Sequence, residues 1–596
     1  MKVSEEEEEV GGYTSPLMSP HFATSTSSSE EPSEGVEKKK RMRIEEEGPL
    51  VISSVDDLLK TTTAWRPYPL FIIFSMSFLW SLCALSAISP AFTAPAADDC
   101  TENCSFYTIQ HEFNLTASFF LLEPAELTTS IYFLGNLLIG QLFAVLADRF
   151  GRRPIIIFSL LLTGIAGSLG SLAPNFPLLV VARFVQGSCY TPLTTVNYVL
   201  SGESIPHRSQ SLTSIFFGVS WVCGYCFLAP LSVWFPTWRS LQFATSIPNI
   251  IVAVVLMITL PESLGWSVEK NHRKSVQAWI QKNEMFSCRK LNYNLDAIMD
   301  NKEENEQQQR LTIFQMFREI LSDRSITRRM IVETFLWILT FMTYCALSLT
   351  STSVGNSDPL VSFLFSGIVE LPAYLFIPIC LKWTKRRPTR FVCHFTGSIA
   401  LLTMYFLSYD TSLHLIIWLI AKFCAACCYI FCFIYAAELF PTFCRSCCIG
   451  VCSTCCNIGA IVAPHIFAID SVAPGAQFLV LAGVGVVCSV LTWFQQETKL
   501  MLNACRRLFT FRIDSRYIGC CFNEPEYKDR KKKLKKDRLC IKCLLPHEED
   551  IPCTSNKKCH WKKTHHISMC PEDIEIKWEE SDGQSNIFSV HQLKLW

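Results

Sequence analysis

The sequence predicts an all-α membrane protein with twelve transmembrane helices in two six-helix halves. Of its 596 residues, 49% are apolar and only 18% are charged, a balance typical of membrane proteins. A bilayer core about 30 Å thick needs roughly 20 mostly apolar residues per helix, and twelve segments reach about that length. They are residues 69–92, 127–147, 154–173, 177–201, 211–234 and 241–260, then 327–350, 358–382, 390–409, 412–437, 446–468 and 474–494.

Each of two motifs occurs twice in the chain, and the two copies are separated by nearly the same number of residues in both cases, which indicates an internal repeat. "DRFGRRP" follows the second segment and "TKRRP" follows the eighth, and their prolines, Pro154 and Pro388, are 234 residues apart. "GESIPHR" follows the fourth segment and "AELFPTFCR" the tenth, with Glu203 and Glu438 235 residues apart. Parallel repeats of this kind place a transport site between the halves, near the middle of the membrane.

The rest of the chain divides by composition. We expect a disordered cytosolic tail (1–64), a first half (65–260) with an external loop (93–126), a cytosolic loop (261–326), a second half (327–498) and a Cys-rich basic cytosolic tail (499–596).

Basic residues orient the chain. Lys and Arg gather in 148–154, 261–326 and 382–390, which the positive-inside rule places in the cytosol with both termini. The first loop then faces outside, where Asn103 and Asn114 stand in glycosylation sequons. We expect the plasma membrane as the location.

Charged clusters at the predicted cytosolic ends suggest a latch between the halves. The acids and bases there can pair in one state and separate in another, although a basic loop that only sets topology remains the alternative. The candidate latch residues are Asp148, Arg149, Arg152, Arg153, Glu203, Arg208, Glu438 and Arg445.

Several of these stretches resemble a known family. "LADRFGRRP" looks like the signature loop of the major facilitator superfamily. "TWRSLQFATSIP", "LPES", "GIVELPAYLF" and "AELFPTFCRS" are similar to its organic ion transporter branch, solute carrier family 22. The resemblance covers about residues 127–498 and implies the major facilitator fold and transport by alternating access, not enzyme activity. Ala144 and Gly265 replace a Gly and an Arg of the family pattern, so this is a divergent member.

Glu370 is the acidic side chain that we expect deep in the second half. A buried carboxylate is costly unless a cationic substrate, a proton or a basic side chain neutralises it. Lys422, in the tenth segment, is the alternative structural partner. Trp337 and Tyr344 are seven residues apart and share a helix face, where they could stack on an organic cation or simply pack.

The resemblance adds substrate-binding candidates. Cation-transporting relatives carry the same Trp and Tyr, and Tyr198 matches an aromatic residue of their pocket. Asn457 stands where cation carriers have Asp and many anion carriers have Arg, and Tyr374 stands where anion carriers tend to have Lys. The pocket therefore favours cationic, zwitterionic or neutral solutes over anions, unless Asn457 only joins two helices by a hydrogen bond.

The tail adds weaker hypotheses. The basic run 528–538 could bind anionic membrane lipid or stay solvated. We expect no metal site, with a zinc site that includes Cys540 and Cys543 as the alternative. A cytosolic partner of the tail is a further hypothesis. We expect no cofactor and no nucleic-acid partner.

The predicted function is transmembrane transport of a small organic solute, with a cation or zwitterion as the predicted cargo. Two alternatives stay open at this point. One is a transporter-like sensor or scaffold that carries nothing, and the other is a carrier of a neutral, sugar-like solute.

Overall fold

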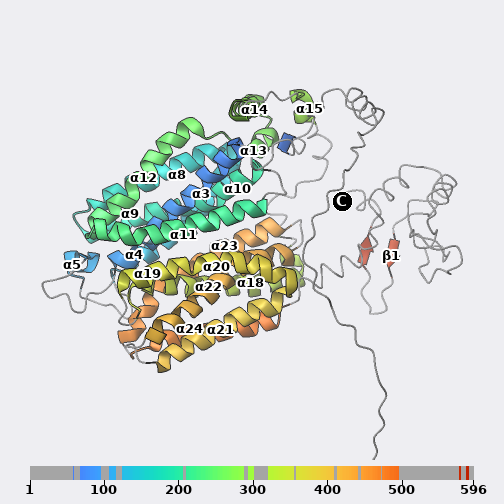
Figure 1. The fold of residues 1–596 in the computed structure, drawn as a ribbon. Helices are drawn as coiled ribbons and strands as arrows, with labels where there is room; N and C mark the ends of the chain where they lie inside the picture. The colour runs from blue at the N-terminus through green and yellow to red at the C-terminus, as the bar shows by residue number, and fades with distance from the viewer. Residues whose placement is uncertain are drawn as a thin grey trace, which may run out of the picture.

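The computed structural model forms two groups of long helices that lie against each other (Figure 1). It describes residues 58–59, 67–94, 106–115, 124–205, 210–287, 293–300, 318, 320–354, 358–407, 412–440, 444–471, 473–495, 576–578 and 586–588. The N-terminal tail apart from 58–59, Asn103, Arg208, the basic run 528–538, Cys540 and Cys543 lie outside these residues. In the C-terminal tail, β1 (Ile576–Trp578) pairs antiparallel with β2 (Asn586–Phe588).

The first six segments form the N-terminal half. Their elements are α3 (Pro67–Ile88) with α4 (Pro90–Thr93); α6 (Leu127–Gly135), η1 (Asn136–Gly140) and α7 (Gln141–Phe150); α8 (Arg152–Ser171); α9 (Phe176–Ser188), η2 (Pro192–Val196) and α10 (Asn197–Glu203); α11 (Gln210–Trp234); and α12 (Trp238–Thr259).

The other six segments form the C-terminal half. Their elements are α18 (Arg324–Leu349) with η4 (Thr350–Thr352); α19 (Pro359–Ile368) and α20 (Glu370–Trp383); α21 (Arg386–Phe406); α22 (Ser412–Leu439); α23 (Arg445–Val462) with η5 (Ala463–Ser471); and α24 (Ala476–Trp493). Among the described residues, ten helices are long and apolar enough to cross a membrane. The interrupted α9–α10 segment and α21 complete the predicted set of twelve.

Local chemistry explains where several of these helices begin. The Asp323 carboxylate accepts a hydrogen bond from the Ser325 N–H at the start of α18, 2.8 Å away. Thr237 and Ser240 form a reciprocal capping box at the start of α12. The turn between α19 and α20 precedes Pro372, which has no N–H to give to the preceding helical turn.

Both halves pack their helices in the same pattern. In the N-terminal half α3 lies along α11, α8 along α12 and α6 along α9. In the C-terminal half α18 lies along α23, α21 along α24 and α20 along α22, which are the corresponding pairs. The structure thus shows the duplication that the motif spacing predicts.

Short helices mark the two ends of the helix bundle. The α14 end carries α13 (Leu264–Glu269), α14 (Arg273–Ser287) and α15 (Leu295–Asp300), and the α5 end carries α5 (Ile109–Phe113) (Figure 1). Trp279 of α14 packs edge-on against Tyr68 of α3, with ring centroids 5.4 Å apart. The segment between the halves therefore includes helices, and one of them packs on the N-terminal half.

The halves meet through α11 against α19 and α20, and through α6 against α23. Near the α5 end, the Ser130 hydroxyl donates to the Ile461 carbonyl at 2.7 Å and lies 2.9 Å from the His465 Nε2. Thr352 donates to the Ala91 carbonyl at 2.9 Å. These contacts close the interface between the halves at the α5 end.

Candidate functional site

A buried ion pair lies at the face of the C-terminal half that meets the N-terminal half. The Lys422 Nζ of α22 lies 2.9 Å from a carboxylate oxygen of Glu370, and both side chains are at most 1% exposed. Glu370 is the first residue of α20, where the free N–H groups of a helix start favour a negative charge. The structure therefore contains the Glu370–Lys422 pairing that the sequence left as an alternative.

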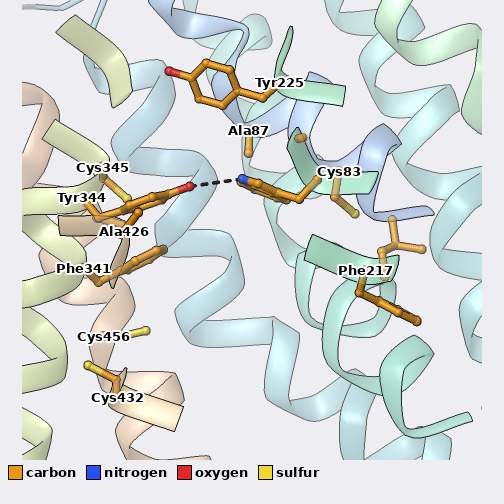
Figure 2. Packing of buried hydrophobic residues seen from close by; sticks show 14 of the residues in the cluster. Cys83, Ala87, Phe217, Tyr225, Phe341, Tyr344, Cys345, Ala426, Cys432 and Cys456 are labelled. Atoms are coloured by element: carbon orange, nitrogen blue, oxygen red, sulfur yellow. Dashed lines mark hydrogen bonds between the residues drawn. The ribbon is translucent and has the colours of Figure 1, made fainter. Parts of the chain in front are cut away.

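Tyr344 connects this ion pair to the opposite half. Its hydroxyl donates to the second carboxylate oxygen of Glu370 at 3.1 Å and accepts from the Trp221 indole N–H at 3.1 Å. Figure 2 shows the Tyr344 hydroxyl pointing across the interface, with this bond as a dashed line. The Lys422 Nζ lies 4.1 Å from the centre of the Tyr344 ring and also bonds to the Ser348 hydroxyl.

Aromatic rings from both halves surround the pair. On the C-terminal side Phe341, Tyr344 and Tyr429 stack, with the Tyr344 and Tyr429 centroids 5.3 Å apart. On the N-terminal side Tyr225 lies 5.6 Å from the Lys422 Nζ, measured to the ring centre, and its hydroxyl bonds to Ser366 at 2.9 Å. Such rings attract a cation through their electron-rich faces.

The other two predicted aromatic residues, Tyr198 and Tyr374, lie on α10 and α20. Tyr198 packs against Phe217 of the N-terminal half at 5.3 Å between ring centroids and bonds to the Ser214 hydroxyl. Tyr374 lies against the backbone of Gly218, where an added Cβ would meet its ring at 2.7 Å. Tyr374 therefore lies where the halves approach each other, whereas the contacts of Tyr198 stay within the N-terminal half.

Asn457 joins the two halves. Its Oδ1 accepts a hydrogen bond from the Asn136 Nδ2 at 2.9 Å, and its own amide donates to the Thr454 carbonyl at 3.0 Å. Asn136 in turn accepts from the Thr191 hydroxyl at 2.7 Å. In this conformation Asn457 makes the helix-to-helix hydrogen bond that the sequence left as its alternative role.

Trp337 belongs to a second buried network, which sequence reasoning missed. Its indole N–H donates to Glu333 at 3.2 Å. Glu333 pairs with Arg390 at 2.9 Å, both fully buried, and accepts from Gln495 at 2.6 Å. Glu370 is thus not alone as a buried acid of this half. Glu333 stands one helical turn before Trp337, a spacing that could have revealed the pair.

The predicted latch residues pair inside their own halves in this conformation. Arg152 lies 2.7 Å from Glu203 and 3.5 Å from Asp148, all in the N-terminal half. Arg386 lies 3.0 Å from Glu438 in the C-terminal half. These two pairs occupy corresponding positions of the repeat.

The remaining basic latch candidates contact backbone or rings of their own half. The Arg153 guanidinium donates to the Met257 carbonyl. Arg149 lies over the Phe150 ring, 5.4 Å from its centre. Arg445 donates to the Phe440 carbonyl at 3.4 Å.

The α5 segment is anchored to the N-terminal half through the "TWRS" stretch. Glu112 accepts hydrogen bonds from the Trp238 indole at 2.6 Å and from the Arg239 Nε at 2.7 Å. Asn114 follows in a left-handed conformation with φ of 48° and is exposed, as a glycosylation acceptor must be.

A small cavity lies elsewhere, within the C-terminal half. Thr340, His394, Cys424 and Cys488 contribute to its lining, and its volume is about 30 Å³. One or two water molecules fill such a space. It is therefore too small to be the path of an organic solute.

Comparisons with known proteins agree with this architecture. The profile of the Major Facilitator Superfamily matches residues 70–464. A transporter of Caenorhabditis elegans is 30% identical over 450 residues, 75% of this chain and 90% of that protein. Organic anion transporter 3 of Oryctolagus cuniculus is 25% identical over 408 residues, 68% of this chain and 74% of the relative.

A second solute carrier and a solved structure extend the match. Solute carrier family 22 member 2 of Rattus norvegicus is 26% identical over 396 residues, 66% of this chain and 69% of the relative. The partially occluded inward-open xylose transporter XylE of E. coli superposes with a TM-score of 0.56 at 14% identity, covering 73% of this chain and 99% of that chain, which shows the fold alone. The chain therefore belongs to the major facilitator superfamily, has solute carrier family 22 transporters among its relatives, and is a multi-pass transporter that works by alternating access.

Proposed function

We propose that the protein carries small organic cations or zwitterions across the plasma membrane, with Glu370 as the counter-charge of the cargo. The observation that carries this proposal is a buried carboxylate at the interface between the halves, bonded to Tyr344 and surrounded by aromatic rings from both sides. Carboxylate and ring faces together suit a positively charged organic group. The relatives include transporters named for anions as well as for cations, so the site residues must decide between them.

The charge at this site argues against an anionic cargo. Lys422 is the one cation at the pair among the described residues, and Glu370 already neutralises it. Asn457 and Tyr374 bring no positive charge at positions where anion carriers tend to have one. An organic anion would therefore meet Glu370 without a free counter-ion.

The α14 end is the cytosolic end in this proposal, and both termini lie in the cytosol. The basic connections gather there, while Asn114 lies at the α5 end. In this orientation the contacts between the halves at the α5 end shut the site toward the outside. On opening to the outside, Arg152, Glu203, Arg386 and Glu438 would exchange partners across the halves and act as the cytosolic latch.

Uptake by cells that express the full chain tests the cargo. Labelled cations, zwitterions, anions and sugars are compared between wild type and Glu370→Gln at equal surface abundance. Loss of a charged hydrogen bond worth about 1.5–3 kcal/mol lowers cation uptake efficiency by about tenfold or more. Asp296→Asn, the same change at an exposed ion pair, serves as the matched control and leaves uptake unchanged.

The single variant leaves Lys422 without its counter-charge, which costs folding stability. The double variant Glu370→Gln, Lys422→Met removes both charges. Its cation uptake is measured in place of that of the single variant when the single variant does not reach the surface. Cation uptake that survives in the double variant would contradict the role of Glu370.

A neutral solute is the second candidate, because Glu370 and Lys422 cancel each other's charge in this conformation. Sugar uptake that is indifferent to Glu370→Gln would support it. No uptake of any panel member by a protein shown to be at the surface would favour a sensor or scaffold.

A further inference from the structure

Lys422 depends on Glu370 for its charge balance. Apart from that carboxylate, its contacts are the neutral Ser348 hydroxyl and the faces of Tyr344 and Tyr225. Glu333, the other buried acid described in this half, is already held by Arg390, Gln495 and Trp337. Within the part of the chain that the structure describes, Lys422 therefore has no second carboxylate to pair with.

The charged and titratable groups around the pair come from three elements. They are Glu370 and Tyr374 of α20, Tyr344 and Cys345 of α18, and Tyr225 and Cys226 of α11. Only Glu370 among them carries a charge when its neighbours are in their ordinary protonation states. The site has one negative and one positive group before any cargo arrives.

A cationic cargo upsets this balance. When an organic cation pairs with the Glu370 carboxylate, two positive charges share one negative charge at a buried position. An uncompensated buried charge is strongly unfavourable, and a lysine can remove it by giving up a proton. The neutral amine can still bond to the Ser348 hydroxyl, so no polar group is left without a partner.

We propose that the protein exchanges an organic cation for a proton through Lys422. The exchange rests on the proposed function, because it needs a cation at Glu370. As the cation binds, one N–H bond of the Lys422 ammonium breaks and its proton passes to water on the side where the site is open. When the cation leaves on the other side, the amine takes a proton from water there and pairs with Glu370 again.

This cycle moves one proton out for each monovalent cation moved in, so no net charge crosses the membrane. A pH gradient of one unit, acid inside, then supports about a tenfold accumulation of the cation at equilibrium. The membrane potential has no effect on this equilibrium. A simple carrier would instead accumulate a monovalent cation roughly 50-fold at 100 mV, inside negative.

The test uses the purified full chain in liposomes and labelled tetraethylammonium, a quaternary ion with no exchangeable proton of its own. One arm imposes an inside-acid pH gradient at zero membrane potential, and the other imposes an inside-negative membrane potential at equal pH. Wild type accumulates the probe with the pH gradient, ignores the potential, and releases one proton per cation, as read by a trapped pH dye.

Lys422→Arg is the diagnostic variant because arginine keeps its proton. Its remaining uptake is slower, follows the potential and releases no protons. Lys274→Arg, the same change at an exposed lysine of α14, behaves as wild type.

Measurements on the wild type alone distinguish cation–proton exchange from simple cation transport, so the test holds even if Lys422→Arg does not fold. Wild-type uptake that follows the potential without proton release would overturn the exchange and leave cation transport standing. Absence of tetraethylammonium uptake, with uptake of another class in the cell panel, would overturn the cargo and the exchange together.

Discussion

The two halves share one fold but differ in how they use their central positions. Glu370 stands eighteen residues before Pro388, and Asn136 stands eighteen before Pro154. Lys422 stands sixteen residues before Glu438, and Gly187 stands sixteen before Glu203. The C-terminal half thus has an ion pair where the N-terminal half has an amide and a glycine.

This difference assigns separate tasks to the halves. Gly187 lets α9 approach α6 closely, since an added Cβ would lie 1.8 Å from the Tyr132 carbonyl oxygen. Asn136 bonds to Asn457 of the other half. The N-terminal half therefore contributes close packing and neutral polar contacts, and the C-terminal half contributes the charges that a cargo would meet.

The largest loss of stability is expected at Glu333, a buried acid of the C-terminal half. Glu333→Gln leaves Arg390 buried without its carboxylate, which costs about 3–5 kcal/mol of stability. Arg183, a buried cation of the N-terminal half with no acidic partner among the described residues, bonds to the Ser86 carbonyl and the Gln186 amide, so Arg183→Gln costs about 1.5–3 kcal/mol of stability. Thermal unfolding of the purified variants checks the order, and equal losses would remove this distinction between the halves.

Corresponding glycines offer the next test. Gly224 and Gly459 each stand twenty-one residues after the motif glutamate of their half. An added Cβ would lie 2.3 Å from the Ser81 carbonyl oxygen or 2.1 Å from that of Ile338. Alanine at either position lowers the free energy of unfolding by about 1–3 kcal/mol because the paired helices must separate.

Gly483→Ala is the control for these glycines, because nothing lies within 4 Å of its added Cβ. Unfolding temperatures should fall together for Gly224→Ala and Gly459→Ala and stay unchanged for the control. A loss in one half only would mean that the repeat does not share its packing energetics.

The two motif ion pairs should show smaller and similar effects. The glutamate of each pair, Arg152–Glu203 and Arg386–Glu438, is partly exposed, so replacing it with Gln costs about 1 kcal/mol of stability. Initial uptake rates and unfolding temperatures of Glu203→Gln and Glu438→Gln are the measurements. If only one variant altered both readouts, the two pairs would not be equivalent parts of a latch.

The smallest effect is expected where the halves touch through amides. Asn457→Ala removes the bond from Asn136, worth about 0.6 kcal/mol on average within membranes. That energy shifts the population about threefold away from the state closed at the α5 end. Hydrogen–deuterium exchange of η1 and α23 reports the shift, and an unchanged exchange rate would show that the bond does not hold this state.

Much of the fold could be predicted because its signals are local. The length of each apolar segment and the basic residues beside it identify the helices, whose ends lie within a few residues of the predicted ones. Motif spacing likewise predicts the duplication. Glu333 was missed because it stands near the start of its segment, and its burial depends on Arg390 and Gln495 from distant helices.

The sequence by itself determined the membrane class, the twelve helices, the repeat and the short set of polar residues inside the spans. Hydrophobic length and charge placement carry that information residue by residue. Only the tertiary structure decided which partner each polar residue takes: Lys422 for Glu370, Asn136 for Asn457 and Arg390 for Glu333. Buried polar groups must find partners, and the packing of helices far apart in the chain determines which ones lie within reach.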